Sequence, residues 1–161
     1  MNPSDDLANS ILWECNHFSK LTSLQLYEIL QLRNEVFVVE QNCPYQDCDN
    51  KDKDAMHITA YSKNKLVAYS RIISPGIAYP GAASIGRVLT APDARKKEIG
   101  KSLMKYSIQQ CESMHKSSPI IIAAQLYLER FYMQFGFERS SQNFLEDNIP
   151  HLMMFRASGE L

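Results

Sequence analysis

The chain has 161 residues, of which 45% are hydrophobic and 22% are charged, and its formal net charge is −1. This length predicts one globular domain over residues 1–161, and the near-neutral charge gives no electrostatic basis for a nucleic-acid partner, because phosphates demand a basic surface. The apolar runs are too short to span a bilayer, and residues 1–10 lack a signal-peptide pattern and are expected to be loosely ordered. We therefore expect a cytoplasmic protein, with no membrane partner, whose four cysteines are reduced thiols.

The N-terminal third predicts a strand, a helix and a polar loop. Residues 11–16 fit a strand, and Thr22 or Ser23 can cap the helix that follows. Residues 42–54 form a loop with four aspartates, but they match neither an EF-hand pattern nor a standard zinc spacing. We expect no metal in this loop, which is either solvated or attracts a cationic substrate.

Two charges interrupt the apolar stripe of the predicted helix. Arg33 falls in the middle of the stripe, and Glu40 lies on it four residues after Val36. Opposite charges on a face that should be buried need each other or a ligand, because an uncompensated buried charge is costly. The alternative is a break in the helix near residues 32–34, which would let Arg33 reach solvent.

The middle of the chain predicts a hairpin and then a strand that leads into a long helix. Residues 56–61 and 66–73 alternate in polarity around a short polar turn, and residues 82–90 form the next strand until Pro92 stops it. The helix that follows should bury one face, which holds Gly100, Leu103, Met104, Ser107, Ile108 and Cys111.

This strand–turn–helix junction predicts an anion site. The first N–H groups of a helix have no partners within it, and Arg95, Lys96 and Lys97 add positive charge. The sequence matches neither a Walker loop nor a dinucleotide fingerprint. From the junction alone, a phosphate site and an ordinary βα turn with a basic cap are equally good interpretations.

The C-terminal part predicts three more strands and a short helix. Residues 119–124 are a continuous apolar run, typical of a strand that is covered on both faces. Residues 126–135 should form a helix that ends at Gly136, a common position for glycine. Residues 137–140 and 149–156 should then pair as antiparallel strands.

The junction resembles a motif of a known family. Its pattern, Thr90-x-Pro-x-x-Arg95-x-x-Glu98-x-Gly100, resembles the acetyl-CoA loop of the GNAT N-acetyltransferases. The chain departs from that motif at Glu98, where the family has glycine, and a carboxylate there is unfavourable near a pyrophosphate unless it points to solvent.

Two further stretches strengthen this resemblance. Tyr132-x-x-x-Gly136-Phe137 is similar to a family element whose tyrosine hydroxyl lies near the cofactor sulfur, and Gln125 stands where a pantetheine contact is common. The stretch from Arg33 to Asp49, together with His57, Ala68–Ile72, Gly86–Val88 and Ile149–His151, resembles the ElaA-type branch of the family.

The resemblance implies a fold, a reaction and a cofactor. The fold would be mixed α+β, with a central, mostly antiparallel sheet of about six to seven strands, splayed middle strands and helices on both faces. The reaction would move an acetyl group from acetyl-CoA, without a metal, to an amine by direct attack. The resemblance does not give the acceptor, and the acidic loop of residues 42–54 favours a small cationic one. A homodimer is a further possible state of assembly. The implied cofactor-binding residues are Val88, Leu89, Thr90, Arg95, Lys96, Lys97, Glu98, Ile99, Gly100, Lys101, Gln125 and Tyr132.

The catalytic roles are less completely defined. A backbone N–H near residues 88–90 can polarise the thioester carbonyl, and Tyr132 can protonate the departing thiolate. The flanking strands carry no acid, so by elimination the general base is Glu40, His57 or His151, with the first two favoured. The expected substrate-binding residues are Arg33, Glu40, Arg71 and His151. The alternatives are an acyl-homoserine-lactone-synthase-like acyltransferase and a non-catalytic module that binds acetyl-CoA.

Overall fold

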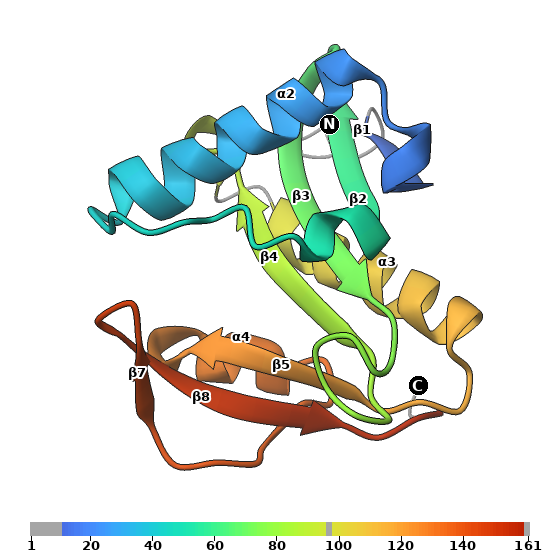
Figure 1. Cartoon of the computed structure of the whole chain (residues 1–161), viewed down its shortest axis with the longest axis vertical. Coiled ribbons are helices and arrows are strands. Elements are labelled where there is room, and N and C mark those ends of the chain that lie inside the picture. The colour runs from blue at the N-terminus through green and yellow to red at the C-terminus, as the bar shows by residue number, and fades with distance from the viewer. Residues whose placement is uncertain (1–10, 96–97, 160–161) are drawn as a thin grey trace, which may run out of the picture.

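The computed structural model describes residues 11–95 and 98–159, which form two antiparallel sheets with helices packed against them (Figure 1). The first sheet contains, in spatial order, β1 (Ile11–His17), β2 (Ala55–Ser62), β3 (Lys65–Ile73) and β4 (Ser84–Thr90). In the second sheet, β8 (Ile149–Arg156) pairs with β5 (Ile120–Gln125), β6 (Glu138–Arg139) and β7 (Phe144–Glu146). The helices are α2 (Ser23–Arg33), α3 (Ile99–Met114) and α4 (Glu129–Met133). Shorter helical segments are Phe18–Lys20, the π-helix Asn34–Glu40, Lys51–Asp54, Pro92–Ala94 and Leu126–Leu128.

The first sheet forms as the alternating pattern predicts. Its β2–β3 hairpin turns at Lys63 and Asn64, whose φ angles of 49° and 63° are those of a tight two-residue turn that matches the twist of the strands. Thr22 caps α2 by accepting a hydrogen bond from the backbone N–H of Gln25, and the side chain of Gln25 accepts one from the N–H of Thr22. The expected hairpin and helix cap are confirmed.

The two sheets meet at one end and diverge at the other. β4 and β5 are linked by a parallel bridge between Ala83 and Ile120, at the start of both strands. Beyond this bridge the strands splay apart, and a wedge opens between the sheets (Figure 1). The expected fold class, with splayed middle strands, is confirmed, although the described strands belong to two sheets.

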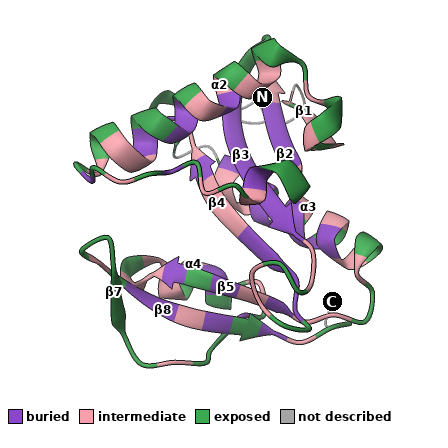
Figure 2. Ribbon diagram, in the orientation of Figure 1, coloured by how far each residue is buried: buried purple, intermediate pink, exposed green. Residues whose placement is uncertain are grey.

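The core lies where α2 and α3 cover opposite faces of the first sheet (Figures 1 and 2). The predicted buried face of α3 is confirmed except at Gly100, which is half-buried. The buried residues of this helix are Ile99, Leu103, Met104, Ser107, Ile108 and Cys111.

The segment after α2 differs from both sequence expectations. The α-helix ends at Arg33, but the chain continues as a π-helix over Asn34–Glu40 instead of breaking. A π-helix has more residues per turn than an α-helix, so spacings of four residues no longer mark one face. For this reason Glu40 is exposed while Arg33 and Val36 are buried.

The second sheet also differs in detail. β5 is covered on one face only: Ile120, Ile122 and Ala124 are buried, whereas Ala123 is exposed. The predicted coverage of both faces is therefore wrong, because an apolar run does not reveal which of its faces is packed. Residues 126–135 form a 3₁₀ turn followed by the short helix α4, and β7 was not predicted.

Candidate active site

The wedge between the sheets contains an open cleft of about 590 Å³, within the size range of small-molecule sites. Its walls come from β3, β4 and β5, from residues 37–51, from α4 and the 3₁₀ turn before it, and from the β7–β8 turn. Five predicted site residues line it: Arg71, Val88, Gln125, Tyr132 and His151. The structure thus brings together residues that are up to 80 positions apart in the chain.

A β-bulge shapes the β4 wall at Val88. Tyr69 of β3 pairs with Leu89, and Arg71 pairs with Gly86, so two β4 residues stand opposite one β3 residue. The first of these two, Arg87, has a φ of 51°, in the left-handed region that ordinary residues rarely adopt. The bulge changes the direction of the strand beside Val88 and interrupts the regular ladder within the cleft.

Tyr132 enters the opposite wall from α4. Its ring is buried and makes edge-to-face contacts with Phe131 and Phe137, at centroid distances of 5.2 and 6.1 Å. Burial raises the pKa of Tyr132, so that the hydroxyl is protonated at neutral pH. This hydroxyl makes no hydrogen bond to any residue that the structure describes. The Tyr132 hydroxyl is therefore available to donate its proton to a ligand in the cleft.

The predicted cofactor loop joins β4 to the start of α3. Glu98 precedes the helix with a φ of 58°, which is the conformation that the family's glycine would adopt without strain. Its side chain is 74% exposed and pairs with Lys101 at 2.8 Å, so it points to solvent as the anion site requires. A Cβ on Gly100 would lie 3.8 Å from Thr90 Cγ2, an ordinary contact. Lys96 and Lys97 lie outside the described residues.

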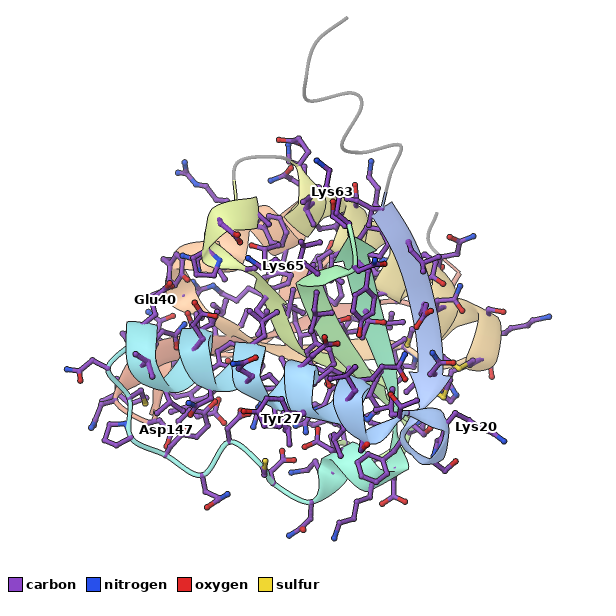
Figure 3. The ribbon with its side chains drawn as sticks, turned by 90° about the horizontal axis from the view of Figure 1, so that it is seen from above. Lys20, Tyr27, Glu40, Lys63, Lys65 and Asp147 are labelled. Atoms are coloured by element: carbon purple, nitrogen blue, oxygen red, sulfur yellow. The ribbon has the colours of Figure 1, made fainter. Side chains whose placement is uncertain are left out.

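Two contacts tie this loop and β5 to the end of the π-helix. The Nη2 of Arg95 lies 2.8 Å from Oε1 of Glu40, and both side chains are 40% exposed. Gln125 donates from Nε2 to Oε1 of Gln41 at 3.2 Å. Glu40 lies at the edge of the molecule (Figure 3) and does not line the cleft. The expected place of Glu40 on a buried stripe beside Arg33 is thus wrong, because the π-helix turns it outward.

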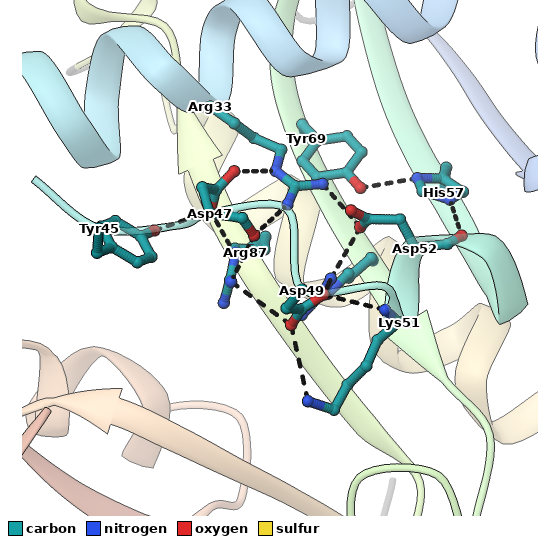
Figure 4. A network of polar contacts seen from close by, with 10 residues as sticks. Arg33, Tyr45, Asp47, Asp49, Lys51, Asp52, His57, Tyr69 and Arg87 are labelled. Atoms are coloured by element: carbon teal, nitrogen blue, oxygen red, sulfur yellow. Dashed lines mark hydrogen bonds and ion pairs between the residues drawn. The ribbon is translucent and has the colours of Figure 1, made fainter. Parts of the chain in front are cut away.

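Arg33 lies instead in a cluster of three arginines and three aspartates, of which all but Asp49 and Arg87 are buried (Figure 4). This arginine–aspartate cluster comprises Arg33, Arg71, Arg87, Asp47, Asp49 and Asp52. Arg33 is 0% exposed and donates to Asp47 Oδ2 and to Asp52 Oδ1, each at 2.7 Å. It does not line the cleft, so the expected contact of Arg33 with a substrate does not fit its position.

The rest of the cluster fixes the acidic loop against the first sheet. Arg71 donates to Asp49 at 2.5 Å and to Asp52 at 2.8 Å, while Arg87 donates to Asp47 at 2.7 Å. Burial alone would raise the pKa of Asp49, but hydrogen bonding to Arg71 and the charges of Arg71 and Arg87 hold it well below its usual range. Arginines pair with the carboxylates of Asp47, Asp49 and Asp52. These carboxylates are therefore not available to attract a cationic substrate, contrary to what the composition of the loop suggested.

His57 is locked inside the first sheet. Its Nε2 lies 2.9 Å from the backbone oxygen of Asp52, which can only accept, so Nε2 donates and Nδ1 accepts from the Tyr69 hydroxyl at 2.7 Å. Burial lowers the pKa of His57. The ring does not line the cleft, and both of its nitrogens are engaged, which leaves no free lone pair for a substrate proton.

Sequence reasoning missed the partners of these residues and the polar end of the cleft. Asp47 and Asp52 follow Arg33 by 14 and 19 residues, a spacing that no helical or strand periodicity connects. Glu146 and Asp147 line the cleft beside His151, and only the polar turn before Ile149 could have indicated them. Leu89 is buried in the core and can offer only its backbone to a ligand.

Outside the cleft, residues 11–95 and 98–159 contain a further hollow but no metal-binding group or membrane-spanning helix. A second hollow of about 430 Å³ lies between α2 and the β2–β3 turn, and Glu28, Glu35, Lys65 and Asp93 are among its lining residues. No group of three His, Cys, Asp or Glu in these ranges could hold a metal ion. None of the helices found there is long and apolar enough to cross a membrane.

Known proteins provide an independent comparison. The sequence profile described as an acetyltransferase (GNAT) domain matches residues 23–157. The chain is 40% identical to Protein ElaA of Escherichia coli K12 over 148 residues, which is 91% of this chain and 96% of that protein. The crystal structure of E. coli ElaA matches with a TM-score of 0.85 and covers 91% of this chain and 99% of the other.

Two further solved structures share the fold. An acyl-CoA N-acyltransferase from Pseudomonas aeruginosa is 40% identical, with a TM-score of 0.85 and coverage of 91% and 99%. An aminoglycoside 6′-N-acetyltransferase complexed with coenzyme A is 15% identical, with a TM-score of 0.65 and coverage of 89% and 96%, which shows likeness of fold alone. Because the family profile and the ElaA match both extend over most of its length, the chain belongs to the GNAT family of acyl-CoA N-acyltransferases.

Proposed function

We propose that this acyltransferase moves an acetyl group from acetyl-CoA to the amine of a small cationic acceptor by direct attack. The observation that supports this most is that Val88, Gln125 and Tyr132, from three separate elements, line one cleft. Bound acetyl-CoA would supply the acetyl group as an activated thioester.

The start of α3 would hold the pyrophosphate. The first N–H groups of this 16-residue helix have no partners within it, and Ile99, Gly100 and Lys101 carry three of them. Arg95 lies just before the helix and would exchange Glu40 for phosphate oxygens. Gln125 would bind the pantetheine amides where the two sheets splay. These residues fit the cofactor because they offer donors to an anion and an amide partner along the wedge.

Val88 and Tyr132 would then act on the thioester. The backbone N–H of Val88, beside the bulge, would stabilise the oxyanion as the amine attacks. The C–N bond forms, the C–S bond breaks, and the Tyr132 hydroxyl gives its proton to the departing thiolate. Because burial raises the pKa of Tyr132, the hydroxyl still carries its proton at neutral pH when the thiolate departs.

The acceptor would carry positive charge besides the reacting amine. Among the described residues that line the cleft, Glu146 and Asp147 are carboxylates without an arginine or lysine partner. They would attract a cation to the end of the cleft that lies by the β7–β8 turn. In this proposal Glu146 and Asp147, and not the acidic loop of residues 42–54, give the site its preference for a cationic acceptor.

The experiment has two arms. Calorimetry should detect acetyl-CoA binding that weakens as salt rises, and thiol release should be measured with benzylamine, lysine, spermidine and other primary amines. Gly100→Glu should abolish binding through a bulky like charge at the anion site, whereas Gly100→Ala should bind normally, since its Cβ has room. Binding without thiol release from any amine would favour a sensor, and undiminished binding by Gly100→Glu would show that the cofactor site is misplaced.

A further inference from the structure

His151 occupies a fixed position at the polar end of the cleft. On β8 it stands opposite Gln125 of β5 on one side and Phe144 of β7 on the other. Its ring stacks on Phe144, with centroids 6.0 Å apart and planes inclined by 25°. The side chain is buried except for the part that lines the cleft. Neighbours on both sides therefore hold the ring in one orientation.

The contacts of the ring assign its proton. Nδ1 lies 2.7 Å from the backbone oxygen of Ile149, and a carbonyl oxygen can only accept, so Nδ1 carries the hydrogen. In the neutral ring Nε2 then keeps its lone pair. No described residue donates a hydrogen bond to Nε2. This is the reverse of His57, whose two ring nitrogens are both engaged within the fold.

A carboxylate stands beside that lone pair. Oε2 of Glu146 lies 3.7 Å from Nε2 of His151, and the Glu146 side chain is 54% exposed. The carboxylate is within ion-pair distance of the imidazolium that forms when Nε2 takes up a proton. Its exposure gives that proton a route to water. The other titratable groups at this end of the cleft are Cys43, Tyr79 and Asp147, and burial together with the charge of Glu146 raises the pKa of Tyr79, which keeps it neutral.

We propose that His151 is the general base of the transfer and that Glu146 is its positioning partner. The inference rests on the proposed acetyl transfer. As the amine attacks, its N–H bond breaks and the proton passes to Nε2, while the C–N bond forms and the C–S bond breaks. The thiolate takes its proton from Tyr132, and the imidazolium beside Glu146 releases its proton to solvent. The Tyr132 phenolate then takes up a proton from solvent, so that both groups return to their starting states.

The test begins with the tautomer of the parent protein. Nitrogen-15 NMR of the imidazole rings, at a pH where they are neutral, should show His151 protonated at Nδ1. A ring protonated at Nε2 would overturn the proposal, because that nitrogen could not accept a proton. This arm needs no acceptor, so it is independent of whether any tested amine is a substrate.

The kinetic arm uses thiol release with the best amine of the benzylamine, lysine and spermidine panel. His151→Asn keeps a donor for the Ile149 oxygen and removes Nε2, so kcat should fall by about 100-fold with acetyl-CoA affinity unchanged. Glu146→Gln should lower kcat by about 10-fold in the parent and have no further effect in His151→Asn, because the two act as a unit. The matched control Glu138→Gln, on exposed β6, should leave kcat unchanged.

Chemical rescue separates a base from a packing residue. Imidazole added to His151→Gly should restore part of the lost rate, while Tyr132→Phe should not respond to it. Full activity of His151→Asn, or additive effects of the two cleft substitutions, would overturn the proposal and leave acetyl transfer standing. If the parent protein releases no thiol with any amine, acetyl transfer itself fails, and the assignment of His151 fails with it.

Discussion

The arginine–aspartate cluster of the first sheet and the polar side chains of the second sheet border the same cleft, yet they are partnered very differently. Arg33 is completely buried and donates to two carboxylates and a backbone oxygen. Tyr132 and His151, on the opposite side, have a hydroxyl and a ring nitrogen that no described residue engages. Charges that pair with one another inside the fold hold its shape, although Nε of Arg71 has no partner among the described residues. Donors and acceptors left open in a cleft are free to act on a ligand.

The cluster has a clear structural task. It joins the end of α2, the loop of residues 42–54 and the strands β3 and β4, and so it forms the rigid wall against which the cleft opens (Figure 4). A buried ion pair adds little net stability because desolvation offsets the attraction, but removal of one partner leaves an uncompensated charge. We therefore expect substitutions in the arginine–aspartate cluster to lower stability, and substitutions of Tyr132 and His151 to lower turnover.

The largest effect should follow from Arg33→Met. Asp47 and Asp52 would lose a buried cation, and the free energy of unfolding should fall by about 3–5 kcal/mol. Urea denaturation measures the change. Arg130→Met, at an exposed position, is the matched control and should stay within about 0.5 kcal/mol of the parent. Equal effects of the two substitutions would contradict a structural role for the cluster.

Tyr132→Phe should show the opposite behaviour. We expect kcat to fall by about 100-fold, because the thiolate would leave without its proton donor. The free energy of unfolding and the affinity for acetyl-CoA should hardly change, since the hydroxyl has no partner among the described residues. Tyr27→Phe, on the exposed side of α2, is the control. Weaker acetyl-CoA binding with undiminished kcat would instead make Tyr132 a packing residue.

The stability should fall in two stages as pH decreases. Burial lowers the pKa of His57, so the unfolded chain takes up a proton first and stability begins to fall below about pH 6.5. The arginines hold the pKa values of Asp49 and Asp52 below their usual range, so their contribution is lost below about pH 4. Urea midpoints across this range measure both stages. His57→Gln should remove the upper stage, and its persistence in that variant would contradict this assignment.

The smallest effect should come from Glu40→Gln. The ion pair between Glu40 and Arg95 is well exposed and contributes less than about 1 kcal/mol to stability. Without that carboxylate Arg95 is free for phosphate, so the affinity for acetyl-CoA should rise by a few-fold, most clearly at low salt. Calorimetry measures this, and Glu35→Gln on the same helix is the control. A fall in kcat at unchanged affinity would instead restore Glu40 as a candidate for the base.

Much of the fold could be predicted from local patterns. Alternation identified the β2–β3 hairpin, and helical spacing identified the buried face of α3, because packing on one face leaves a period in the sequence. The π-helix could not be predicted in this way, since it changes the period on which the argument relies. β7 could not be predicted either, because Phe144–Glu146 is only three residues long, too short to show an alternating pattern, and its two apolar residues are exposed.

The site was predictable where a motif fixed it and not where distant residues met. The motifs identified Val88, Gln125 and Tyr132, which share the cleft. The partners of Arg33 depend on how a loop folds back across the sheet, and no local spacing encodes that contact. His151 was a candidate by elimination and through the resemblance of residues 149–151 to the family branch. Its tautomer depends on the oxygen of Ile149, which only the folded strand brings to it.

The location of the cofactor site can be tested directly by titrating acetyl-CoA into nitrogen-15-labelled protein and following backbone amide shifts. We predict that the largest changes map to residues 88–90, to residues 98–101 at the start of α3, and to Gln125 at the end of β5. Residues lining the second hollow, such as Glu28, Glu35 and Lys65, should change little. Large shifts in that hollow with none at the start of α3 would contradict the account.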